Sequence, residues 1–172
     1  MRGPAGRVKI DVEDLLGFAE AAGVRTVLLS IVAEEVEHGL AGAIADAYGT
    51  TFRPYELLRR QKNTQRKAQE LAQRMETANP AIPPGAIAEA REFFHRHPRD
   101  MAPFSVRDKS SVPGPNDLRL ILQAAALGSP THLVTRDGHF LAYADVLRER
   151  WRITVHDGAR LPFLLLEWRA HL

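Results

Sequence analysis

The chain has 172 residues, a length that suits one domain, and 45% of them are hydrophobic, which permits a folded core and excludes a disordered chain. It contains no cysteine, so disulfide frameworks and thiolate metal sites are excluded. No apolar run is long enough to cross a membrane, and the first residues lack the apolar segment of a signal peptide, so we expect a cytoplasmic protein. The net charge of +2 does not by itself require a polyanionic partner.

The first forty residues alternate between strand and helix patterns. Residues 7–11 predict a short strand ending in Asp11, and apolar residues at helical spacing follow it as far as Gly23, a natural helix stop. Residues 24–30 predict a buried strand, and its last residue, Ser30, is placed to cap the helix that comes next. This alternation is typical of a parallel sheet covered by helices.

The middle of the chain has a different pattern. We predict no strand between residues 41 and 99, and the apolar spacing there favours helices interrupted by the Pro-rich segment 79–84. The sequence therefore predicts a helical insertion over residues 41–100, within a single domain of residues 1–172.

The alternation returns after the insertion. The predicted elements are a loop at 105–116, a helix at 117–128, a strand at 132–135, a helix at 139–151, a strand at 152–157 and a short final helix within 158–172. Taken together, the pattern predicts an α/β domain with a central parallel sheet flanked by helices.

Acidic residues gather at the carboxyl ends of the predicted strands, where parallel sheets bind their ligands. Asp11 ends the first strand, Asp137 follows a late strand, and Asp117 starts the helix that leads into that late strand. Glu34 and Glu35 lie early in the helix after the second strand, at the same edge. Such acids repel one another unless a cation holds them, and hard oxygen ligands suit Mg²⁺ or Mn²⁺. Such a site can cleave phosphodiesters.

Each of these acids also has a purely structural interpretation. Asp11 and Asp117 are placed to cap helices, Asp137 suits a turn, and Glu34 and Glu35 could be solvated charges on a helix surface. Only their shared edge favours metal binding over these alternatives.

Four short blocks, in this order, resemble the PIN-domain ribonucleases, a family that includes toxins of bacterial toxin–antitoxin pairs. The blocks are KIDVEDLL with Asp11, VLLSIVAEEVEHG with Glu35, NDLRLILQAAALG with Asp117 and TRDGHF with Asp137. The resemblance implies a PIN-like α/β fold and a metal-dependent endoribonuclease in which these four acids hold Mg²⁺ or Mn²⁺. It also implies RNA as the substrate and an antitoxin as a possible protein partner.

The chain departs from the family pattern at two positions. Glu13 stands where the family often has a small polar residue, and it is a possible extra ligand. His139 stands where some members carry another Asp; it could contact a phosphate or the attacking water, or be a surface histidine. Two further candidates are Asp108, in the loop ahead of Asp117, and Thr135, which could orient a carboxylate or water.

A basic segment lies within the predicted insertion. Residues 53–74 hold seven basic and two acidic residues, a net charge of +5. Four basic residues fall near one helical face and are candidate RNA contacts: Arg59, Lys62, Arg66 and Lys67. A solvated helix rich in Lys, Arg and Gln is the structural alternative.

Two other functions stay open at the level of sequence. A PIN-like module could bind RNA or a protein partner without cleaving anything, and the apolar tail LPFLLLEW could pack against such a partner or form a homodimer. An aspartate-based phosphoryl-transfer enzyme would use Asp11 as nucleophile. However, such enzymes place a lysine near a late strand, and the last lysine here, Lys109, precedes the late strands.

Overall fold

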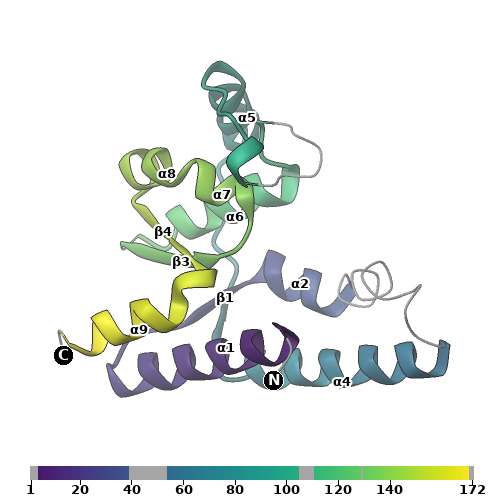
Figure 1. Cartoon of the computed structure of the whole chain (residues 1–172). Coiled ribbons are helices and arrows are strands. Elements are labelled where there is room, and N and C mark those ends of the chain that lie inside the picture. Colours follow the sequence, from purple (N-terminus) through teal and green to yellow (C-terminus); the bar gives the residue numbers. More distant parts are fainter. Residues whose placement is uncertain (1–3, 39–53, 105–110, 129, 171–172) are drawn as a thin grey trace. The chain divides into compact units, whose positions relative to one another are not determined.

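The computed structural model describes residues 4–38, 54–104, 111–128 and 130–170, without the side chains of 4–12, 35–38, 54, 55, 57, 60 and 64. Within these residues the chain is a mixed α/β structure rich in helices (Figure 1). It divides into two compact units. The small unit is Leu16–Asn79, and the large unit combines Met1–Leu15 with Pro80–Leu172.

The small unit is built on a parallel pair of short strands. Its elements are the end of α1 (Pro4–Ala21), β1 (Val27–Leu29), α2 (Ser30–His38), α4 (Pro54–Ala72) and β2 (Glu76–Ala78). In the register of the pair, Val27 lies opposite Glu76 and Leu29 opposite Ala78. Leu29 is buried, as are Leu16 and Ile31. Burial of these aliphatic side chains is the main stabilising contribution to so small a unit.

Several predictions for this unit are confirmed. The first helix ends before Gly23, whose φ of 66° lies in the left-handed region that glycine adopts most easily. The strand predicted over 24–30 is present as the shorter β1, and Ser30, which was predicted to cap the next helix, is the first residue of α2. The Ser30 hydroxyl donates a hydrogen bond to Asn79 Oδ1 at 2.9 Å, which ties the start of α2 to the end of β2.

Two strand predictions in the first eighty residues are wrong. Residues 7–11 are part of α1, so Asp11 is a helix residue and does not end a strand. Alternation over only five residues is weak, and neither Pro nor Gly separates this segment from the helical residues that follow. β2 lies in the middle region, where no strand was predicted. It has three residues, and the parallel pairing with β1 defines it rather than any pattern of its own.

The large unit contains the late strand-and-helix pattern. Its elements after Pro80 are α5 (Ala86–Arg96), η1 (Ala102–Phe104), α6 (Pro115–Ala125), β3 (Thr131–Thr135), α7 (Gly138–Ala142), α8 (Ala144–Trp151), β4 (Ile153–Asp157), η2 (Gly158–Arg160) and α9 (Leu161–Arg169). These confirm the late strands and the final helix. The helix predicted over 139–151 is instead two helices, α7 and α8, which meet at Tyr143.

The strands of the described residues form two separate parallel pairs. β1 pairs with β2 in the small unit, and β3 pairs with β4 in the large unit. The parallel direction was predicted. The described residues do not show a central parallel sheet flanked by helices. The first strand predicted for that sheet, residues 7–11, is helical.

An aromatic cluster forms the core of the large unit. Phe94 of α5 and Tyr143 are completely buried, and their rings meet edge to face with centroids 4.7 Å apart. Trp151 lies against Phe94 at 5.5 Å. The Tyr143 hydroxyl lies 2.6 Å from the carbonyl oxygen of Ser111 and 3.1 Å from that of His97. It therefore joins the segments that precede α6 and follow α5, and burial raises the pKa of this phenol.

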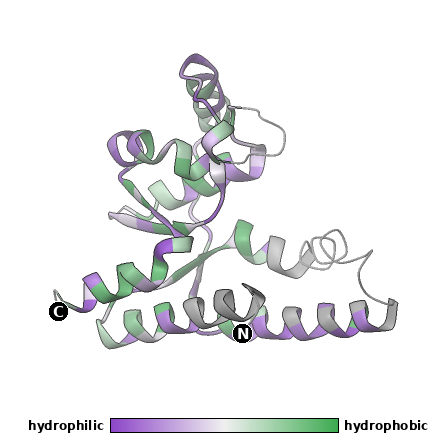
Figure 2. Cartoon of the chain, in the orientation of Figure 1, coloured by the Kyte–Doolittle hydropathy of each residue, from purple (hydrophilic) through white to green (hydrophobic). Residues whose placement is uncertain are grey.

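The polar and apolar residues are distributed unevenly among the helices. Figure 2 shows hydrophilic residues along α4 and hydrophobic ones along α9. In α9, Leu161 and Leu165 are buried, while Phe163 and Leu166 are exposed. None of the helices in the described ranges has the length and apolar character needed to span a bilayer.

We expect opposite effects from two glycine substitutions. A Cβ at Gly158 would lie 3.2 Å from Cγ of Arg136 and 3.3 Å from the carbonyl oxygen of Thr135, whereas a Cβ at Gly17 in α1 meets nothing within 4 Å. Gly158→Ala should therefore destabilise the protein by about 1–3 kcal/mol. Gly17→Ala should stabilise it by about 0.5–1 kcal/mol, because alanine is the better helix former. Urea unfolding of both variants checks this, and equal shifts would contradict it.

Candidate functional site

Two aspartates lie at the carboxyl ends of neighbouring parallel strands in the large unit. Thr135, the last residue of β3, lies opposite Asp157, the last residue of β4. Asp137 follows β3 by two residues, and each of the two aspartates is followed by glycine. The carboxyl ends of parallel strands are where α/β structures place ligands, so this edge is the first candidate for a site.

Each carboxylate stabilises the turn that follows its own strand. Asp137 Oδ1 accepts a hydrogen bond from the backbone N–H of His139 at 2.7 Å. Asp157 Oδ1 accepts one from the backbone N–H of Ala159 at 2.8 Å. Within the described residues no bond reaches the Oδ2 atom of either aspartate. Each carboxylate therefore stabilises its turn with one oxygen, and its other oxygen accepts no hydrogen bond from the described residues.

Thr135 and His139 surround Asp137. The Thr135 hydroxyl oxygen accepts a hydrogen bond from the backbone N–H of Asp137 at 3.0 Å. His139 Nδ1 lies 3.5 Å from Asp137 Oδ1, and only 13% of the His139 side chain is exposed. The His139 side chain is therefore largely buried with its Nδ1 near the Asp137 carboxylate, while Thr135 holds the backbone of Asp137.

Asp117 caps its helix. It is the third residue of α6, and its Oδ2 accepts a hydrogen bond from the backbone N–H of Gly114 at 2.9 Å. The negative charge also complements the helix dipole. The capping interpretation of Asp117 is thus correct, and capping leaves metal binding by this carboxylate open.

The other predicted acids do not add a described ligand to this edge. Glu13 in α1 and Glu34 in α2 are exposed. Asp11 and Glu35 belong to α1 and α2, but their side chains lie outside the described residues, as does all of Asp108. Among the side chains that the structure describes, no three His, Asp or Glu residues gather closely enough to hold a metal ion. The convergence of four acids stays a prediction.

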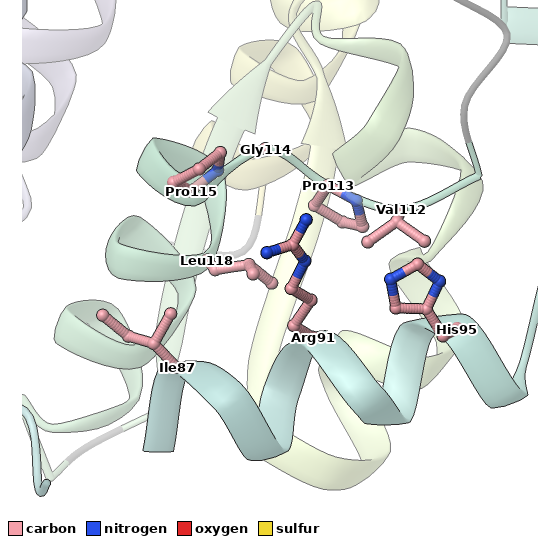
Figure 3. A pocket seen from close by; sticks show the side chains of 8 residues that line it. All are labelled: Ile87, Arg91, His95, Val112, Pro113, Gly114, Pro115 and Leu118. Carbon is pink, nitrogen blue, oxygen red and sulfur yellow. The ribbon is translucent and has the colours of Figure 1, made fainter. Parts of the chain in front are cut away.

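A hollow of about 210 Å³ lies between α5 and the start of α6. It is lined by Ile87, Arg91, His95, Val112, Pro113, Gly114, Pro115 and Leu118. In Figure 3 the Arg91 guanidinium extends toward Gly114, and His95 lies beside Val112. Because Gly114 is also the hydrogen-bond donor to Asp117, this hollow places an arginine next to the start of α6.

The predicted basic face is present on α4 in the small unit. Arg59, Lys62 and Arg66 are exposed, and Lys67 is half-buried. Arg66 also lies 3.6 Å from Glu70, one turn further along. Positions three and four apart share one side of a helix, so three cations face solvent together. Contact of these residues with RNA stays a prediction.

A pair of histidines lies on one face of the β3–β4 sheet. His132 Nδ1 and His156 Nε2 are 2.8 Å apart. Trp168 of α9 stands edge to face against both rings, 5.1 Å from His156 and 6.4 Å from His132 between centroids. Burial, followed by the charge of His132, lowers the pKa of His156, so its neutral form is favoured.

The lowered pKa of His156 predicts a loss of stability in acid. Its folded-state pKa lies below the ordinary value of 6.5, so the unfolded chain takes up the proton first. The free energy of unfolding is therefore highest above pH 6.5 and falls as the pH drops from there toward the lowered pKa. Urea unfolding midpoints above and below pH 6.5, measured with EDTA, check this. His156→Gln should flatten the dependence, and an unchanged slope in that variant would contradict the assignment.

Sequence reasoning missed Asp157 and the histidine pair. A signal for Asp157 was available, since TRDG and VHDG end the two late strands in the same way. The pair had none, because His132 and His156 meet only through the register of β3 and β4.

The chain matches no protein-family model, no curated protein and no solved structure.

Proposed function

We propose that this chain is a metal-dependent endoribonuclease with a PIN-like α/β fold. The observation that carries the proposal is the pair Asp137 and Asp157, which lie at the carboxyl ends of the neighbouring parallel strands β3 and β4 and each bind their turn through one oxygen. Asp117, at the start of the helix that leads into β3, is the third acid of the large unit in the proposed site. Asp11 and Glu35 belong to the proposal through the four-block resemblance alone.

The residues present suit a hard divalent cation. Carboxylate oxygens are the ligands that Mg²⁺ and Mn²⁺ prefer. When bound, such an ion supplies an activated water and stabilises the leaving oxygen of a phosphodiester. The hydrogen bonds from the His139 and Ala159 N–H groups orient the carboxylates of Asp137 and Asp157, and His139 Nδ1 lies 3.5 Å from Asp137 Oδ1.

Basic side chains at two places suit a polyanionic substrate such as RNA. Arg91, in the hollow beside α6, offers a guanidinium that matches the geometry of a phosphate. The exposed cations of α4 offer contacts with the RNA backbone that carry no sequence information. The proposal therefore predicts cleavage with modest sequence preference and binding that weakens as salt rises.

The test is cleavage of a mixed RNA pool by the wild type with Mn²⁺, with Mg²⁺ and with EDTA. Metal-dependent cleavage that Asp117→Asn abolishes would support the proposal, because asparagine keeps an oxygen for the cap and removes the charge. Cleavage that survives both EDTA and this substitution would overturn it.

A module that binds RNA without cleaving it is the second candidate. The exposed basic face of α4 favours it, because Arg59, Lys62 and Arg66 face solvent. Retained RNA binding with no cleavage in any metal would establish this function instead. Substitution of all three by glutamine should then weaken binding uniformly across RNA sequences.

A further inference from the structure

The two imidazoles of the histidine pair point at each other in nearly the same plane. Their planes differ by 9°, and their centroids are 5.1 Å apart, while His132 Nδ1 and His156 Nε2 are 2.8 Å apart. The centroid separation exceeds the N···N distance by about one ring width. The rings therefore lie edge to edge, with two ring nitrogens directed at one point between them.

We propose that His132 and His156 form a binding site for one late first-row divalent cation, such as Zn²⁺, Ni²⁺ or Cu²⁺. Neutral imidazole is a preferred ligand of these ions. Zn–N bonds are about 2.0–2.1 Å long, so a small outward rotation of the rings admits the ion where the hydrogen bond now lies. These ions bind imidazole nitrogen more tightly than Mg²⁺ and Mn²⁺ do, because Mg²⁺ and Mn²⁺ favour oxygen ligands.

The surroundings of the pair favour a cation. His132 is opposite Thr154 and His156 is opposite Val134, so the register of two paired strands fixes the backbone positions from which the two side chains project. The His132 side chain is exposed, which leaves room for water at the ion.

This site is separate from the proposed nuclease site. Successive residues of a strand point to opposite faces of the sheet, so His156 and Asp157 serve different faces. No third His, Asp or Glu among the described side chains joins the pair, so water completes the coordination. The site holds a different class of metal and does not depend on RNA cleavage.

Trp168 allows the site to be tested directly. In a Trp151→Phe background, Trp168 is the single tryptophan, because the chain has two. Its ring contacts both imidazoles, so a paramagnetic Cu²⁺ ion in the site quenches its fluorescence. Zn²⁺ binding is measured in parallel by calorimetry, after EDTA has been removed.

We expect saturable quenching and one equivalent of Zn²⁺. His132→Gln and His156→Gln should each weaken binding at least about 10-fold, while His95→Gln, an exposed histidine of α5, should not change it. Because His132 is exposed, its substitution should leave the fold intact. If circular dichroism shows that His156→Gln does not fold, His132→Gln alone tests the site. Binding of equal strength in His132→Gln, or no saturable binding by the wild type, would overturn the proposal. Mn²⁺-dependent cleavage by His132→Gln should be unchanged, which separates this test from that of the nuclease.

Discussion

Phe94→Ala should destabilise the protein by about 3–5 kcal/mol. Phe94 is completely buried, and its ring contacts Tyr143, Trp151 and Phe93 at centroid distances of 4.7, 5.5 and 5.6 Å. Truncation removes these contacts and leaves a cavity between α5 and α8, which rigid neighbouring rings cannot fill. Because small domains are stable by only about 5–15 kcal/mol, this one change should remove much of the total. Urea unfolding monitored by tryptophan fluorescence measures the loss.

The matched control is Phe163→Ala in α9. Phe163 is 66% exposed, so its truncation removes little buried area and should change stability by less than about 0.5 kcal/mol. Similar losses in the two variants would show that the aromatic cluster does not dominate the core of the large unit.

Asp137→Asn should reduce metal-dependent RNA cleavage more than about 100-fold, since even partners of direct metal ligands contribute about 10–100-fold. Asparagine caps helices as well as aspartate does, so the bond to the His139 N–H can persist. The variant therefore removes the charge and keeps the turn. Cleavage assays in Mn²⁺, together with thermal unfolding to show that the fold is intact, measure both effects.

Asp145→Asn is the control for charge alone. Asp145 is an exposed residue of α8 whose carboxylate lies 2.6 Å from the Arg99 guanidinium, and exposed ion pairs contribute little to stability. This variant should cleave RNA like the wild type. Full activity of Asp137→Asn, or an equal loss in Asp145→Asn, would remove Asp137 from the proposed site.

Local sequence signals predicted the helices and strands whose ends are marked by capping or turn residues. The helix α6 follows Gly114 and Pro115 and carries Asp117 in its first turn, and these residues act within one turn of each other. The strands β3 and β4 are β-branched segments that end at Asp-Gly or shortly before it. The turn chemistry of aspartate therefore indicated the caps at Asp137 and Asp157, although only Asp137 was recognised.

The secondary structure of three segments could not be predicted from local sequence patterns. Residues 7–11 have a strand-like alternation, yet they are part of α1, because a pattern of five residues does not distinguish a strand from little more than one turn of helix. β2 is a strand only because β1 lies beside it. The break at Tyr143, which divides the predicted helix into α7 and α8, accompanies the complete burial of that ring against Phe94.

The sequence by itself determined the mixed α/β class, the parallel direction of strand pairing and the position of Asp137 just after β3. These follow from hydrophobic periodicity and turn residues, which act over a few positions. Only the tertiary structure decided that Asp157 joins Asp137 at one edge and that His132 meets His156 beneath Trp168. Both depend on the register of β3 against β4, which is set by pairing across more than twenty residues and leaves no local pattern in the chain.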